Sequence, residues 1–107
     1  MGIMTSRCDC AYSFSFRARR LRALADACRL AVMEMLLEGS KTVSEMLERM
    51  DLEQSLLSYH LKILRQEGLI ESIREGKSVR YRLPDTVTLQ GPGRGINLGC
   101  CRLEMNF

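Results

Sequence analysis

The stretch that decides the fold is residues 51–83, which read DLEQSLLSYHLKILRQEGLIESIREGKSVRYRL. Within it, Leu57, Leu61 and Leu64 recur at steps of three and four residues, the spacing that places side chains on one face of a helix. We predict a helix over residues 54–67 that turns this leucine face into a core. Its opposite face is polar and rich in hydroxyl groups.

A β-hairpin is predicted directly after this helix. Gly68 stands where a residue with a left-handed backbone commonly ends a helix. The runs 69–74 and 78–83 contain good strand formers, and they flank the turn sequence Glu75-Gly76-Lys77. Basic residues outnumber acidic ones between residues 54 and 82, so the helix and the hairpin together carry a net positive charge.

The residues before this stretch predict further helices. Their apolar side chains recur at helical spacing, Asp26 is a good N-cap and Gly39 a good stop. The expected helices are 17–25, 27–38 and 42–50. A short helix joined by a tight turn to a second helix makes a helix-turn-helix, and the hairpin that follows completes a winged one.

The chain is expected to form one domain, mainly α with a β-hairpin wing, because 107 residues suffice for one core. Apolar residues make up 46% and aromatic ones only 6%, which suits packed helices. We divide the chain into three parts: an N-terminal arm (1–16), a winged helix-turn-helix domain (17–84), and a Gly-rich linker with a cysteine-bearing C-terminal segment (85–107). The arm is expected to be extended, because aromatic residues alternate in it. The C-terminal segment is apolar enough to dock on another surface.

The totals also limit the class of protein. Five cysteines without a leader sequence predict the reducing cytoplasm rather than a secreted disulfide framework. No apolar run approaches the roughly 20 residues that a transmembrane helix needs. No phosphate loop, nucleophile elbow or paired-histidine zinc motif is present, so we do not expect an enzyme.

The polar face of the 54–67 helix has the chemistry of a DNA-reading surface. Hydroxyl, amide and ammonium groups can reach phosphates or base edges in a major groove. Ser55, Ser58, Tyr59 and Lys62 lie on this face, and Gln54, at the start of the helix, can pair with adenine. The hairpin adds cations that can follow the phosphate backbone, namely Arg74, Lys77, Arg80 and Arg82. The alternative is that this is an ordinary solvated helix face.

Two further residues, His60 and Cys28, are expected to be structural rather than to bind DNA or an ion. His60 falls near the leucine face and is predicted as a histidine at the edge of the core, because a metal site needs several convergent ligands. Cys28 is predicted as a core residue, because it lies on the apolar face of its own helix.

Five segments resemble, in order, the ArsR/SmtB family of winged-helix repressors. They are LADACRL (24–30), VSEML (43–47), QSLLSYHLKIL (54–64), EGLI (67–70) and EGKSVRYRL (75–83). The resemblance implies a homodimer that binds a palindromic double-stranded DNA operator and releases it when an inducer binds, often a thiophilic metal or metalloid. It also implies that Gln54, Ser55, Ser58, Tyr59 and Lys62 carry the DNA contacts. This chain departs from the family at Glu53, where a capping serine is common, and at Cys28, where Thr or Ser is common.

The inducer site is not the one many family members use. A Cys-Val-Cys step is replaced here by Thr42-Val43-Ser44, and a histidine-bearing final helix is not expected because the tail is broken by glycines. Four thiols outside the DNA-reading unit remain, Cys8, Cys10, Cys100 and Cys101. Thiolates select soft ions, so the expected inducer is As(III) first and Cd(II) or Zn(II) next. The alternatives are a thiol redox or persulfide sensor, a winged-helix protein-interaction module, and cysteines without a role.

Overall fold

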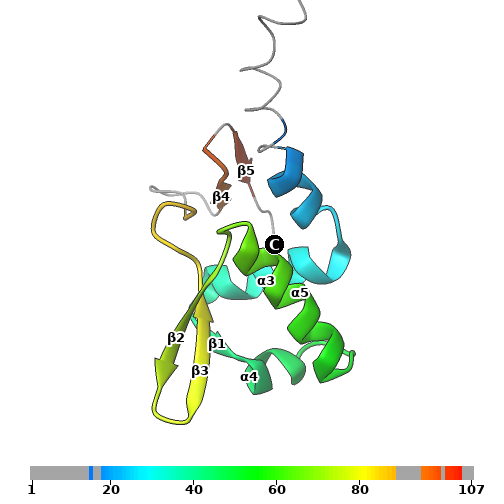
Figure 1. The fold of residues 1–107 in the computed structure, drawn as a ribbon, viewed down its shortest axis with the longest axis vertical. Coiled ribbons are helices and arrows are strands. Elements are labelled where there is room, and N and C mark those ends of the chain that lie inside the picture. Colours follow the sequence, from blue (N-terminus) through cyan, green and yellow to red (C-terminus); the bar gives the residue numbers. More distant parts are fainter. Residues whose placement is uncertain (1–14, 16–17, 89–94, 100, 105–107) are drawn as a thin grey trace, which may run out of the picture.

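The computed structural model describes residue 15 and residues 18–88, 95–99 and 101–104. The chain forms a winged helix-turn-helix, as predicted (Figure 1). After helical residues 18–24, the elements are α3 (Ala27–Glu38), β1 (Lys41–Thr42), α4 (Val43–Leu47), α5 (Gln54–Gln66), β2 (Glu71–Glu75), β3 (Ser78–Arg82), β4 (Gly95–Asn97) and β5 (Arg102–Glu104).

The helix starts follow from local capping. The carboxylate of Asp26 accepts hydrogen bonds from the backbone N–H groups of Cys28 at 2.9 Å and Arg29 at 3.2 Å, which confirms it as the N-cap of α3. At α4, Thr42 and Glu45 form a reciprocal capping box. α5 begins without a side-chain cap, because the residue before it is a glutamate whose side chain makes no such bond.

The end of α5 is set by Gly68. This glycine has a φ of +72°, which L side chains rarely adopt, and the next N–H, that of Leu69, donates to the carbonyl of Leu64 at 2.9 Å. The chain reverses there into β2. The wing turns at Gly76, which also has a positive φ, of +58°.

The wing is a three-stranded antiparallel sheet in the order β1-β3-β2. β3 pairs with β2 along its whole length, so that Arg82 lies opposite Glu71 and Arg80 opposite Ile73. β1 adds a short pairing on the other edge, with Thr42 opposite Arg80. Because Thr42 is also the N-cap of α4, the wing is joined directly to the helix-turn-helix.

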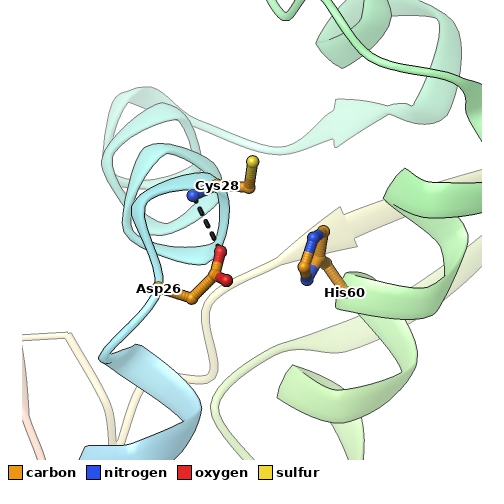
Figure 2. Close-up of side chains that lie close together, drawn as sticks. All are labelled: Asp26, Cys28 and His60. Atoms are coloured by element: carbon orange, nitrogen blue, oxygen red, sulfur yellow. Dashed lines mark hydrogen bonds between the residues drawn. The ribbon is translucent and has the colours of Figure 1, made fainter.

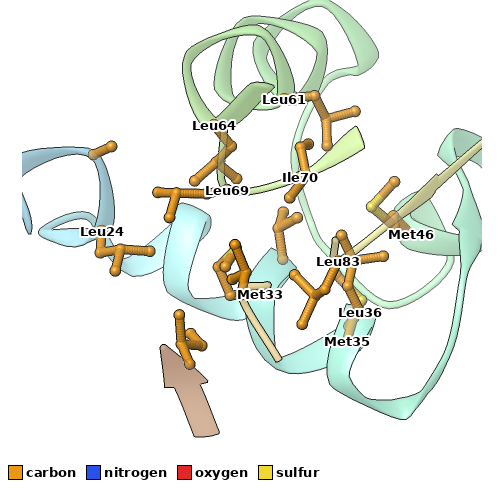
Figure 3. Packing of buried hydrophobic residues seen from close by; sticks show 14 of the residues in the cluster. Leu24, Met33, Met35, Leu36, Met46, Leu61, Leu64, Leu69, Ile70 and Leu83 are labelled. Atoms are coloured by element: carbon orange, nitrogen blue, oxygen red, sulfur yellow. The ribbon is translucent and has the colours of Figure 1, made fainter. Parts of the chain in front are cut away.

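One hydrophobic core holds the elements together (Figure 3). α3 contributes Val32, Met33, Met35 and Leu36, and α5 contributes Leu57, Leu61 and Leu64. The α5 leucines are those that the sequence pattern placed inside. Leu69, Ile70 and Leu83 extend this core to the base of the wing.

The C-terminal region forms a second small hairpin, β4 with β5. Ile96 is completely buried and Leu98 is 3% exposed, so both belong to the core. The N–H of Asn97 donates to the carbonyl of Val87 at 2.6 Å, which attaches the hairpin to the chain that follows the wing. The described part of this apolar end therefore packs on the core of the domain.

The N-terminal arm was expected to be extended to residue 16. At Ser15 this was wrong, because that residue is helical. The rest of the arm lies outside the described residues. Within the described part of the chain, no helix has the length and apolar character required to cross a bilayer.

Candidate nucleic-acid interface

The core holds α5 in one rotational setting. Leu57 and Leu64 are completely buried, so the opposite face of the helix must point outward. Ser55, Ser58, Tyr59 and Lys62 are exposed on that face, and Gln54 is exposed at the first position of the helix. The structure thus brings together on one surface the residues that the sequence selected.

The sequence argument missed one member of this surface, Leu56. Its side chain is 45% exposed, and Tyr59, one turn further on, is 56% exposed. Exposed apolar groups of this kind suit contact with thymine methyl groups in a major groove. The sequence signalled this exposure only by position, because Leu56 does not lie on the helix face that Leu57, Leu61 and Leu64 share.

The wing cations divide into two classes. Arg80 lies 3.3 Å from carboxylate oxygens of both Glu45 and Glu75, and it also donates to the carbonyl of Ser40 at 3.1 Å. Arg82 is paired in the same way, as its guanidinium lies 3.1 Å from Glu71 and 2.9 Å from Asp85. These two arginines share a face of the wing, as expected, but acidic side chains of β2, of α4 and of the segment after β3 already pair with them.

The remaining predicted cations are not neutralised in this way. Lys62, Arg74 and Lys77 are exposed and form no ion pair within the described part of the chain. The tip of the wing and the N-terminal end of α5 lie at the same end of the molecule, with α4 between them (Figure 1). One duplex can therefore meet both.

The four cysteines predicted as inducer ligands are described only in part. Cys8, Cys10 and Cys100 lie outside the described residues. Cys101 is half-buried just before β5, where its carbonyl accepts from the N–H of Leu98 at 2.9 Å.

A different group of potential ligands lies behind α5. One ligand atom each of Asp26, Cys28 and His60 lies within 4.8 Å of the other two. Figure 2 shows Asp26 and Cys28 at the start of α3 and His60 reaching toward them from α5. The sequence argument missed this group, because two of its members are distant in sequence from the third and only the packing of α3 on α5 brings them together.

The burial of these side chains corrects one prediction and confirms another. Cys28 is not a core residue; it is half-buried and lies beside Asp26 and His60, because the first turn of α3 extends beyond the hydrophobic cluster. His60 is 6% exposed, which confirms its predicted place at the core. Its Nδ1 atom is buried and has no hydrogen-bond partner among the described residues.

Asp26 remains a carboxylate at neutral pH. The backbone N–H of Arg29 lowers its pKa most, and the N–H of Cys28 and the nearby charges of His60 and Arg29 act in the same direction. The group behind α5 therefore offers a carboxylate oxygen, a sulfur and an imidazole nitrogen.

Comparison with known proteins places this geometry in a family. The sequence profile described as "Bacterial regulatory protein, arsR family" matches residues 26–72, which run from the cap of α3 into the wing. The HTH-type transcriptional repressor SmtB of Mycobacterium tuberculosis is 42% identical over 65 residues, which are 61% of this chain and 48% of that protein. A probable mercury resistance operon repressor of Streptomyces lividans is 38% identical over 68 residues, 64% of this chain and 54% of that one. The chain thus spans about half the length of these curated relatives.

Solved structures agree with the sequence relatives. Reduced HlyU from Vibrio cholerae superimposes with a TM-score of 0.67 at 35% identity, covering 73% of this chain and 82% of that one. The homodimeric winged helix-turn-helix DNA-binding domain of Mb0332 from Mycobacterium bovis gives a TM-score of 0.64 at 30% identity, covering 68% of each chain. The chain described here belongs to the arsR family of bacterial regulatory proteins.

Proposed function

We propose that this protein is a homodimeric transcriptional repressor that binds an operator in double-stranded DNA and releases it when a thiophilic metal or metalloid ion binds. The observation that carries the DNA-binding part is the outer face of α5. Four polar residues and Leu56 are exposed there and Gln54 is exposed at the start of the helix, while Leu57 and Leu64 behind them are completely buried. Such a repressor acts in the cytoplasm, where the chromosome is.

Each protomer would insert α5 into a major groove. Gln54 has the amide that pairs with adenine, Ser55 and Ser58 can donate to phosphates or base edges, and Tyr59 can contact a thymine methyl group. Lys62, Arg74 and Lys77 would contact phosphates, because none of them is neutralised by a described acidic side chain. Arg80 and Arg82 would act mainly by holding the wing in position. Two protomers would read half-sites roughly 34–36 Å apart.

The inducer would be held by thiolates of Cys8, Cys10, Cys100 and Cys101. Three thiolates suit As(III), which we favour, and four suit Cd(II) or Zn(II). Cys101 is compatible with this role, since it lies in a small hairpin at the edge of the domain. A relative is described as a probable mercury resistance operon repressor, which supports a thiophilic ion as the inducer.

The DNA-binding part can be tested without knowing the operator. Duplexes selected by the protein from a random pool should share a sequence with two-fold symmetry and bind with an affinity that falls steeply with salt. If no sequence is enriched and no duplex is retained in a salt-dependent way, the protein is a protein-interaction module instead.

The inducer part needs the reduced protein bound to a selected duplex. As(III) or Cd(II) should release it, and the double change Cys100→Ser with Cys101→Ser should prevent release by As(III) while leaving DNA affinity unchanged. Release by oxidant or persulfide, reversed by reductant and without response to either ion, would identify a redox sensor.

A further inference from the structure

The side chains of Asp26, Cys28 and His60 have the features of an ion site. His60 is 6% exposed, and its buried Nδ1 has no hydrogen-bond partner among the described residues, so a polar atom is left unsatisfied inside the protein. Cys28 and Asp26 approach the imidazole ring of His60 from the start of α3 (Figure 2). A buried imidazole nitrogen without a partner is costly unless something binds it.

The donor set selects a class of ion. One sulfur, one nitrogen and one carboxylate oxygen form a mixed set that suits Zn(II), Co(II) or Cd(II), with water as a fourth ligand. As(III) is a poorer match, because it favours several thiolates. This set is therefore chemically different from the terminal cysteines.

The distances allow such an ion after a small adjustment. Ligand atoms held by one tetrahedral Zn(II) lie about 3.5 Å apart, given bonds of about 2.0–2.3 Å. The three atoms here lie within 4.8 Å of one another, so they would have to close by about 1 Å. Rotation of the half-buried Cys28 and Asp26 side chains supplies part of this movement. The thiol proton would pass to solvent as the sulfur binds the ion.

We propose that Asp26, Cys28 and His60 form a divalent-ion site that connects the start of α3 to the inner side of the DNA-reading helix. His60 follows Tyr59 directly in α5, so an ion held by its ring acts on the same helical turn that carries an exposed DNA-facing residue. The ion would also compete with Arg29, whose guanidinium lies 3.7 Å from the Asp26 carboxylate. Drawing α5 toward α3 would change the setting of the reading helix and weaken operator binding. This regulatory half rests on the proposed function; the ion site itself does not.

The binding test uses the full-length chain without DNA and without a histidine tag, so that His60 is its one histidine. Cys8, Cys10, Cys100 and Cys101 are changed to Ser, which leaves Cys28 as the one thiol of the five in the chain. Adding Co(II) should give the absorption of a tetrahedral ion with a thiolate charge-transfer band. The matched control adds Cys28→Ser to this variant and should lose the band.

His60 gives a second readout that does not depend on the serine changes. In the wild-type chain, Zn(II) should shift the imidazole NMR signals of His60 to saturation by two ions per protomer, one of which the terminal thiolates take up, and Cys28→Ser should weaken that response at least tenfold. Unchanged His60 signals at a tenfold excess of Zn(II), or an unaltered response in Cys28→Ser, would overturn the site.

The regulatory half is tested on a selected duplex. Zn(II) should weaken the binding of the four-serine variant at least about fivefold, the lower end of ordinary allosteric coupling, and should not affect binding once Cys28→Ser is added. Equal affinity with and without Zn(II), when the spectra show the ion bound, would overturn this half alone. Failure to bind any duplex in either state would instead contradict the proposed function, and the spectroscopic result would stand by itself.

Discussion

The guanidinium of Arg80 lies 3.3 Å from a carboxylate oxygen of Glu45, and this contact connects the wing to the first turn of α4. Glu45 is also the partner of Thr42 in the capping box, and the backbone N–H of Thr42 is the main cause of its lowered pKa, with Arg80 a smaller one. One carboxylate therefore stabilises the start of α4 and positions the strand that pairs with β1.

Glu45→Gln should separate these two roles. Glutamine can still serve in a capping box, so α4 should form normally, but the charge opposite Arg80 is lost. We expect only a small change in stability, because the ion pair with Arg80 is exposed to solvent, and a weaker DNA affinity, because the wing is held less firmly. Urea unfolding and DNA titration measure the two effects. Unchanged DNA affinity would mean that the Arg80 contact does not position the wing.

Lys62→Ala and Lys77→Ala should each weaken DNA binding and reduce the slope of log affinity against log salt by about 1, as expected when one phosphate contact is lost. Arg80→Ala should weaken binding with a smaller change in slope, because its charge is already paired with Glu45 and Glu75. Titrations at several salt concentrations provide the comparison. An equal loss of slope in all three variants would show that Arg80 leaves its partners to bind phosphate.

Asp26→Ala should destabilise the fold by about 1 kcal/mol, because α3 loses the side chain that accepts from two of its first N–H groups. Asp26→Asn is the matched control, since asparagine caps almost as well. The pKa of Asp26 is lowered in the folded protein, so its charge stabilises the fold above the unfolded-state value of about 3.9 and this contribution is lost as the pH falls through the folded-state value. The stability difference between wild type and Asp26→Asn should therefore shrink between pH 5 and pH 2, as followed by urea unfolding. If the stability difference between wild type and Asp26→Asn is constant over this range, the charge of Asp26 does not stabilise the fold.

Gly68→Ala should destabilise the protein by about 1–2 kcal/mol, since its φ of +72° strains any residue with a Cβ. An added Cβ would also lie 3.3 Å from the Arg20 guanidinium, whereas nothing lies within 4 Å of one at Gly76. Gly76→Ala, at a φ of +58°, is thus a control with a similar backbone cost and no neighbour. Thermal unfolding should show the larger loss for Gly68→Ala. An equal loss would mean that the arginine moves away freely.

The main parts of the fold could be predicted from local pattern. The spacing of Leu57, Leu61 and Leu64 determined which face of α5 is buried, because a helix repeats every 3.6 residues. It therefore also determined which polar residues face outward. Asp26 and Gly68 marked helix ends because their chemistry acts on neighbouring N–H and carbonyl groups. The outer face of α5 could therefore be predicted from local pattern alone.

The β4–β5 hairpin could not be predicted in the same way. Its strands have three residues each, too few for a period of two to be distinguished from chance. What places them is the burial of Ile96 and Leu98 in a core built by distant helices.

Only the tertiary structure decided which charged and ligand groups meet. The pairing of Arg80 with Glu45 depends on the register of β3 with β1, and the approach of His60 to Cys28 depends on how α5 packs on α3. Neither arrangement has a local signal, because ionic and ligand contacts act through space between residues far apart in the chain. The sequence by itself therefore determined which residues form the outer face of α5, whereas the packing of the helices and strands decided which of the predicted wing cations pair with described acidic side chains and which three side chains converge behind α5.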